Sequence, residues 1–67
     1  MKAHESHVSH LTLKQGQQVM TTEMHRTGII ADVPPDVTLQ NNHSVLVQFD
    51  DRSLGWMRPS HLLNCDN

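Results

Sequence analysis

The chain has 67 residues, a formal net charge of −2, a single cysteine and only two aromatic residues, Phe49 and Trp56. This length allows one domain, and a domain of this size buries only about 60% of the surface that its unfolded chain exposes. Five Lys and Arg residues against seven acids argue against the dense basic surface that releases phosphate counterions on binding nucleic acid. Two aromatic residues exclude binding mechanisms that need several stacked rings.

The sequence also predicts where the protein works. No apolar run approaches the roughly 20 residues that a membrane-spanning helix needs, and the opening stretch MKAHESHVSH lacks the apolar segment of a secretory signal. Cys65, as the only cysteine, cannot form an intrachain disulfide. We therefore expect a soluble, cytoplasmic protein without membrane contact, which gains stability from self-association or from a protein partner.

Residues 1–12 are polar, rich in His and Ser, and predict a flexible tail in front of a domain that spans residues 13–65. His4, His7 and His10 recur at every third position, and imidazole is a ligand for zinc and nickel. This spacing is not the i, i+4 pairing of a helical zinc site, and it favours a solvated tail. We predict no metal site and no cofactor, and metal binding by the tail stays open.

The first half of the domain predicts two strands and a long loop. QVMTTE follows a Gln-Gly turn signal and is rich in β-branched residues, so Val19 and Thr21 would share one face of a strand. After a polar connection, Gly28 opens a second strand, GIIADV, where glycine suits a bulge or a sharp bend. Two prolines end this strand and begin a loop, PPDVTLQNNH, which Val37 and Leu39 would anchor.

The clearest strand signal is VLVQF, which leads into an acidic turn and a second strand. Residues 50–53 fit a type I turn or a four-residue hairpin loop. With four residues in the loop, Phe49 would face Leu54 and Val47 would face Trp56, giving apolar cross-strand pairs on one face. Val47, Phe49 and Leu54 are thus predicted to point inward, and Trp56 to lie where the core meets the surface.

The rest of the chain completes an all-β pattern. On the other face of the hairpin, Gln48 would oppose Gly55. Residues 58–61 can form one short 3-10 turn, because Pro59 is tolerated at its first position. Residues 62–65 then form a short last strand, and no helical periodicity of useful length occurs.

This order of elements resembles the Tudor/KOW type of Src-homology-like barrel, which has five short strands, one long connection and a helical turn before the last strand. GQQV at 16–19, GII at 28–30 and VLVQFDD at 45–51 carry the resemblance, which covers residues 13–65. It implies a small five-stranded barrel. The VLVQF run followed by Arg-Pro is also similar, more weakly, to the variable chain of ferredoxin–thioredoxin reductase. The aromatic cage of methyl-lysine-reading Tudor domains needs more rings than this subunit has.

Trp56 is the leading candidate for a binding residue, because tryptophan is a common hot spot in protein interfaces. The hypothesis is a non-enzymatic interaction module that binds a protein partner or forms a homo-oligomer through a barrel face centred on this residue. The alternative for this tryptophan is a position in the core, and the alternative for the acidic turn is ordinary turn chemistry. The candidate partner-binding residues are Asp51, Arg52, Trp56, Met57 and Arg58.

Two other functions stay open from the sequence. A KOW- or Tudor-like module could bind nucleic acid through Arg26, Arg52 and Arg58. A multimeric small-barrel enzyme like the trimethoprim-resistant plasmid type of dihydrofolate reductase would carry a Val-Gln-Ile-Tyr run where residues 54–57 read LGWM. No nucleophile elbow, phosphate loop, CxxC pair or HExxH motif occurs, so we expect no catalytic residues and no enzymatic activity.

Overall fold

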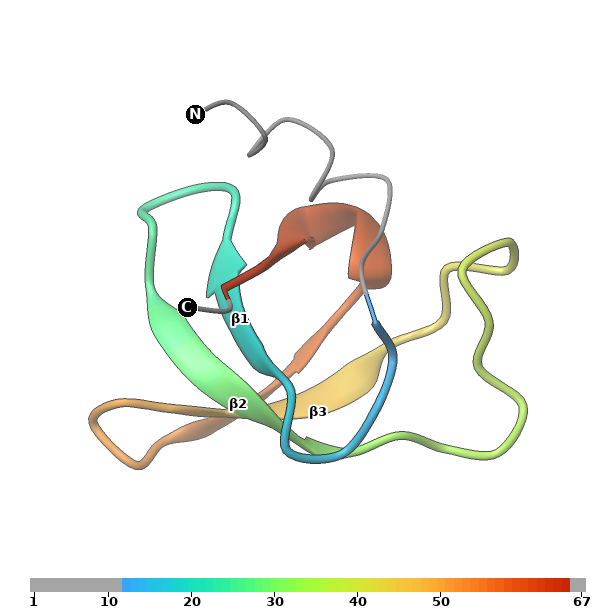
Figure 1. Ribbon diagram of the computed structural model, residues 1–67, viewed down its shortest axis with the longest axis horizontal. Coiled ribbons are helices and arrows are strands. Elements are labelled where there is room, and N and C mark those ends of the chain that lie inside the picture. Colours follow the sequence, from blue (N-terminus) through green and yellow to red (C-terminus); the bar gives the residue numbers. More distant parts are fainter. Residues whose placement is uncertain (1–11, 66–67) are drawn as a thin grey trace.

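The computed structural model describes residues 12–65, which form one antiparallel sheet of five strands (Figure 1). The strands are β1 (Gln18–Thr21), β2 (Thr27–Asp32), β3 (Val45–Phe49), β4 (Leu54–Met57) and β5 (Leu62–Asn64). Their order across the sheet is β4-β3-β2-β1-β5, so β4 and β5 are the edge strands. A 3-10 turn, Pro59–His61, separates these two strands in the sequence. The all-β prediction and the helical turn before the last strand are confirmed.

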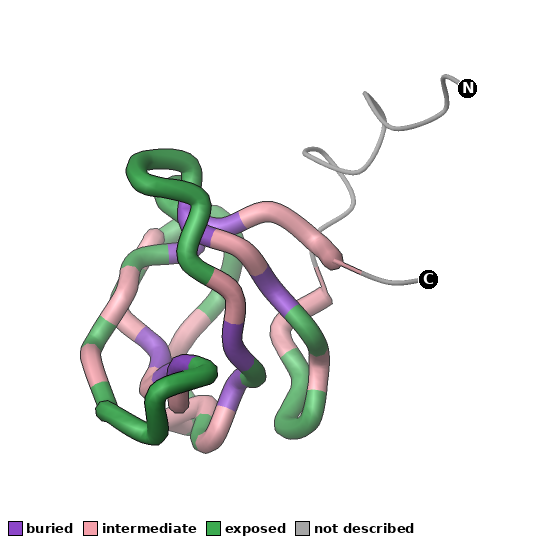
Figure 2. The backbone as a smooth tube through the Cα atoms, turned by 90° about the vertical axis from the view of Figure 1, so that its left-hand side faces the viewer, coloured by how far each residue is buried: buried purple, intermediate pink, exposed green. Residues whose placement is uncertain are grey.

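Residues 12–65 contain no helix that is long and apolar enough to cross a bilayer. The sheet bends around a small apolar core, and the buried positions alternate with more exposed ones along β3 (Figure 2). Val19 and Thr21 both lie on the buried face of β1, as predicted. The core residues come from four strands and are Val19, Ile30, Val45, Val47, Phe49 and Leu62.

The long loop between β2 and β3 is held at two points. Val37 packs against the core, as predicted, whereas Leu39 is 46% exposed and does not anchor the loop. Asn42 Nδ2 donates to Ser60 Oγ at 3.0 Å, and the Ser60 N–H donates to Asn42 Oδ1 at 2.9 Å. These reciprocal hydrogen bonds fasten the loop to the 3-10 turn.

The β3–β4 hairpin has a register that differs by one residue from the prediction. Leu54 lies opposite Gln48, not opposite Phe49, and Trp56 lies opposite Leu46. Because side chains alternate between the two faces, a slip of one residue moves each side chain to the other face. Leu54 consequently points outward and is 60% exposed, so its predicted place in the core is wrong.

The length of the hairpin loop explains this slip. The Phe49 N–H donates to Ser53 O at 2.9 Å, and the Arg52 N–H donates to Phe49 O at 2.8 Å, so only residues 50–52 form the loop. Arg52 has a φ of 74°, in the left-handed region. This geometry is a type I turn followed by a left-handed residue, one of the common three-residue hairpin loops. This position usually holds glycine, so an arginine there carries no local signal for the turn.

Gly55 lies opposite Val47 on the inner side of the hairpin, and its predicted pairing with Gln48 is wrong. A Cβ at this glycine would lie 3.2 Å from the Phe49 ring. The ring therefore covers the inner face of β4 at its centre.

At Gly28, the backbone of β2 lies very close to the backbone of β3. A Cβ at this position would lie 2.5 Å from the Gln48 carbonyl oxygen of β3, so only glycine fits without a backbone shift. The predicted β-bulge does occur in β2, but it lies further along, between Ile30 and Asp32.

Candidate protein-binding surface

The outer face of the sheet carries a patch over β2, β3 and β4 in which four of five side chains are apolar and the fifth is Gln48. Register places Ile29, Gln48 and Leu54 in one row across these strands, with Leu46 and Trp56 in a second row across β3 and β4. The exposed fractions are 40% for Ile29, 60% for Leu54 and 59% for Trp56. These five residues are called the outer patch below. Exposed apolar groups that lie side by side mark interaction sites more often than single exposed residues do.

The exposure of Trp56 decides between the two readings of this residue. Its ring is not buried in the core, and its neighbour across the hairpin is the half-buried Leu46. Trp56 therefore lies on the surface that the sequence analysis proposed for binding. Leu54, which that analysis placed in the core, lies on the same strand and faces the same side.

The outer patch reaches the edge of the sheet at β4. Phe49 and Ser53 form a hydrogen-bonded pair, and in an antiparallel ladder such pairs alternate with pairs whose backbone groups point away. Gly55 consequently bonds to β3, whereas the N–H and C=O groups of Leu54 and Trp56 point to the open side. An open strand edge is a template for pairing with another chain. The same two residues thus offer both apolar side chains and backbone hydrogen-bonding groups.

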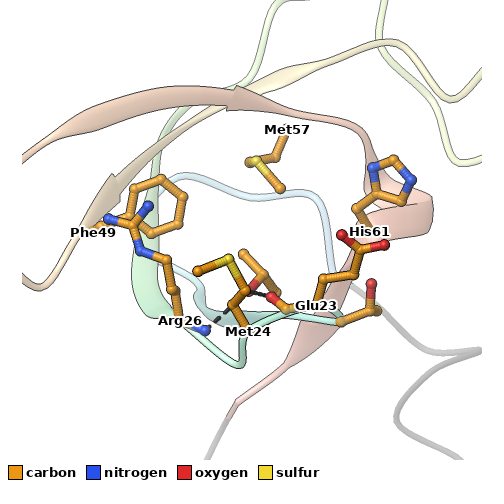
Figure 3. Close-up of a pocket in the computed structure, with 8 residues that line it drawn as sticks. Glu23, Met24, Arg26, Phe49, Met57 and His61 are labelled. Atoms are coloured by element: carbon orange, nitrogen blue, oxygen red, sulfur yellow. Dashed lines mark hydrogen bonds between the residues drawn. The ribbon is translucent and has the colours of Figure 1, made fainter.

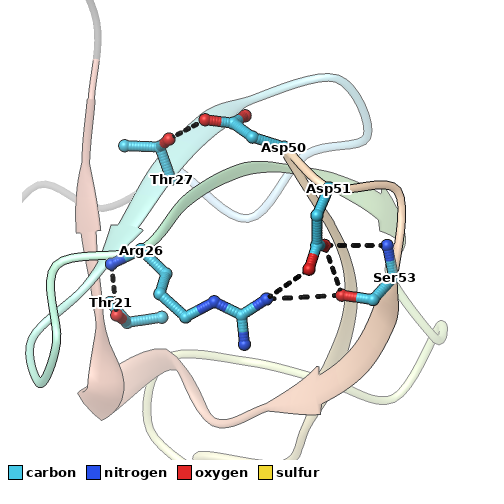
Figure 4. Close-up of polar contacts among 6 residues, drawn as sticks. All are labelled: Thr21, Arg26, Thr27, Asp50, Asp51 and Ser53. Carbon is cyan, nitrogen blue, oxygen red and sulfur yellow. Dashed lines mark hydrogen bonds and ion pairs between the residues drawn. The ribbon is translucent and has the colours of Figure 1, made fainter.

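The acidic turn holds an ion pair and a network of hydrogen bonds (Figure 4). Asp51 Oδ1 accepts from the Ser53 hydroxyl at 2.6 Å and from the Ser53 N–H at 3.0 Å, and Arg26 Nη2 lies 3.4 Å from Asp51 Oδ2. The hydrogen bonds from Ser53 lower the pKa of Asp51, and the charge of Arg26 lowers it further. The Arg26 guanidinium also lies over the Phe49 ring, 4.1 Å from its centroid.

The three arginines proposed for nucleic-acid binding do not gather into one basic patch. Arg26 forms an ion pair with Asp51. Asp50, which precedes Asp51 in the sequence, accepts a hydrogen bond from the Thr27 hydroxyl. Arg52 is exposed in the turn and follows Asp50 and Asp51 directly in the sequence. Arg58 is exposed beyond the other end of β4, a separation of roughly 20 Å for six residues of extended chain. No feature of residues 12–65 favours nucleic acid over protein as the partner.

A pocket of about 190 Å³ lies on the inner side of β4, between the β1–β2 turn and the 3-10 turn (Figure 3). Met57 and Met24 lie on opposite sides of it, Phe49 and Arg26 form one wall, and His61 stands at the other. Met57, predicted to bind a partner beside Trp56, faces this pocket and not the outer patch. Sequence reasoning missed the pocket because three separate segments form its walls.

The β1–β2 turn at the rim of this pocket has unusual backbone geometry. Met24 and His25 have φ values of 66° and 52°, a left-handed conformation that costs about 1–2 kcal/mol per non-glycine residue. The buried Thr21 hydroxyl holds the turn, because it donates to Glu23 O and accepts from the Arg26 N–H at 2.9 Å. This geometry leaves Met24 84% exposed.

His4, His7 and His10, for which the sequence leaves metal binding open, lie outside the described residues. Between residues 12 and 65, no three His, Cys, Asp or Glu side chains come close enough to hold a metal ion together. Cys65 is a half-buried free thiol. Most of the predicted tail also lies outside the described part, but the Thr12 N–H donates to Asn64 Oδ1 at 3.2 Å.

Comparison of the chain with protein-family models, with curated proteins and with solved structures finds no match. The similarity to Tudor/KOW barrels and to the reductase variable chain therefore stays a prediction. The geometry of the outer patch is the basis for the function proposed next.

Proposed function

We propose that the protein is a non-enzymatic interaction module that docks onto another polypeptide, either a protein partner or a second copy, through the outer patch. The observation that carries this proposal is the exposure of Trp56 and Leu54 on one edge strand, at 59% and 60%. Removing a large apolar side chain from water contributes about 1.5–3 kcal/mol when burial is complete. Both residues gain this energy only when another chain covers them.

The parts of the proposed interface have different roles. Trp56 and Leu54 are the apolar anchors. Asp51 and Arg52 in the hairpin turn, and Arg58 beyond the other end of β4, are exposed charges at the rim. Rim charges favour the correct orientation of two partners more than they add to affinity.

The proposed fold type is a small Src-homology-like barrel of the Tudor/KOW kind. Two features support it: the strand order β4-β3-β2-β1-β5, and the 3-10 turn between β4 and β5. Such folds host many unrelated functions, so the proposed activity depends on the outer patch and not on the fold. Location in the cytoplasm stays a prediction.

A binding comparison between two surface variants tests the proposal. The immobilised protein is exposed to a cell extract and, separately, to a tagged copy of itself, with Trp56→Ala and Leu39→Ala treated identically. Leu39 is a matched control, because it is 46% exposed but lies in the β2–β3 loop, outside the outer patch. We expect the wild type and Leu39→Ala to retain the same polypeptides and Trp56→Ala to lose them. Equal retention by a folded Trp56→Ala variant would contradict the proposal.

A further inference from the structure

The edge of β4 is complementary to itself, and we propose that two copies of the chain pair through their β4 strands in antiparallel orientation. In this dimer Leu54 of each copy lies opposite Trp56 of the other, and a two-fold axis passes between the two Gly55 residues. The inference rests on the proposed function, since it names a second copy as the polypeptide that contacts Leu54 and Trp56 of the outer patch.

The backbone groups determine this register. Within β4, only Leu54 and Trp56 direct their N–H and C=O groups away from β3, as the ladder alternation requires. Residues opposite each other in a hydrogen-bonded antiparallel pair exchange both of their bonds. Pairing Leu54 with Trp56 of the second copy satisfies the outward groups of both residues in both copies.

The side chains fit the same register. Opposite residues in an antiparallel pair share a face, with Cβ atoms about 4.5–5.5 Å apart. Leu54 and Trp56 of the two copies would therefore form two apolar pairs on the outer side of a continuous sheet. Gly55 lies at the two-fold axis, where opposite Cα atoms come within about 4.5 Å, and it brings no side chain into this contact.

Charge favours the antiparallel over the parallel orientation. Among residues 12–65, the ion pairs are Arg26–Asp51 and His43–Asp36. Arg58 takes part in neither of them. Antiparallel pairing places the two acidic turns at opposite ends of the dimer. Arg58 of each copy then comes level with Arg52 of the other, at the end of a turn where Asp50 and Asp51 outnumber that arginine. Parallel pairing would instead place the two acidic turns side by side.

The dimer is expected to be weak, because one short edge strand buries less area than a standard protein interface. The net charge of −2 offers little repulsion between copies. Association should therefore be measured by sedimentation over concentrations of about 10 µM to 1 mM, which span the dissociation constants of a weak dimer.

Cysteine cross-linking tests the register. In a Cys65→Ser background, the Leu54→Cys and Trp56→Cys variants are oxidised separately and as an equal mixture. The proposed register places positions 54 and 56 of different copies about 5.5 Å apart at Cα, within disulfide range, and like positions about 7–8 Å apart. Random pairing would give about twice as much mixed disulfide dimer as either homodimer. With the proposed register, we expect the mixed dimer to exceed either homodimer by on the order of tenfold. Leu39→Cys is the control and should not cross-link.

The outcomes separate this inference from the proposed function. A mixed dimer at the random level would contradict the proposed β4 register. A wild type that sediments as a monomer at every concentration would contradict the proposal that a second copy binds β4. A monomer that still retains a different protein through Trp56 would contradict the dimer and leave the proposed function standing. Circular dichroism checks that each cysteine variant is folded, and sedimentation of the wild type needs no variant.

Discussion

The two faces of the sheet carry similar apolar side chains that differ in burial. In β2, Ile30 is fully buried on the inner face and its neighbour Ile29 is 40% exposed on the outer face. In β3 and β4, Val47 lies in the core while Leu54 and Trp56 face outward. An antiparallel sheet with one solvated face usually has polar residues there. The exposed apolar residues of the outer face are the basis of the proposed contact surface, whereas the inner face supplies stability.

Alanine substitution of the two isoleucines gives the largest expected contrast between these faces. Ile30→Ala removes a fully buried side chain and should lower the free energy of unfolding by about 2–5 kcal/mol, enough to unfold a small domain. Ile29→Ala should lower it by only about 1 kcal/mol in the monomer, because this side chain is 40% exposed. Chemical denaturation at low protein concentration measures both. Similar losses in the two variants would show that the faces do not differ as described.

Alanine at the two strand glycines tests how tightly the inner face is built. Gly28→Ala forces β2 away from the Gln48 carbonyl oxygen and should cost about 1–3 kcal/mol. Gly55→Ala should cost less, because its Cβ would meet only the Phe49 side chain, which can move. Thermal unfolding of the two variants gives the ranking. A greater loss for Gly55→Ala would contradict it.

Two neighbours in β4 allow the faces to be compared within one strand. Met57 packs against the core and is half-buried, so Met57→Ala should lower stability by about 1–2 kcal/mol, below the cost at a fully buried site. Trp56→Ala should lower the stability of the monomer by about 1 kcal/mol or less, although it removes a much larger side chain, because 59% of that residue is exposed. Urea denaturation at low concentration checks both values. A strongly destabilised Trp56→Ala monomer would return this residue to the core.

The smallest expected effect is a pH dependence at the edge of the outer face. The pKa of Asp51 is lowered from its ordinary value of 3.8, mainly by hydrogen bonds from Ser53. A lowered pKa in the folded state stabilises the protein above the ordinary pKa, and this contribution is lost as the pH falls through the lowered value. Asp51→Asn should therefore reduce the unfolding temperature slightly at about pH 6 and not at about pH 2. An equal difference at both pH values would contradict this origin.

The sequence predicted the strands because their signals are local. β-branched runs, the two prolines and the proline-led 3-10 turn each act within a few residues, and β3 matches its predicted bounds. The hairpin register was missed because it depends on a single backbone angle. Arg52 occupies a left-handed position that usually holds glycine. The local sequence therefore predicts a four-residue turn, which places Leu54 on the wrong face.

The candidate site was predictable only in part for the same reason. Trp56 could be named from its residue type, but its neighbours on the outer patch follow from pairings between strands. The pocket behind β4 depends on segments far apart in the chain, and on the left-handed pair Met24 and His25, which no local signal marks. Local sequence patterns therefore do not predict the tertiary contacts or the unusual φ values on which the outer patch and the pocket depend.

Quenching of the Trp56 fluorescence by acrylamide tests the central claim most directly, because this residue is the only tryptophan and lies on the edge strand of the outer patch. The emission is recorded from about 10 µM to 1 mM protein, the range expected for a small interface. We predict strong quenching in dilute solution and progressive protection as the concentration rises, with the protection lost in a Leu54→Lys variant. Equal quenching at every concentration would show that no second copy covers this surface.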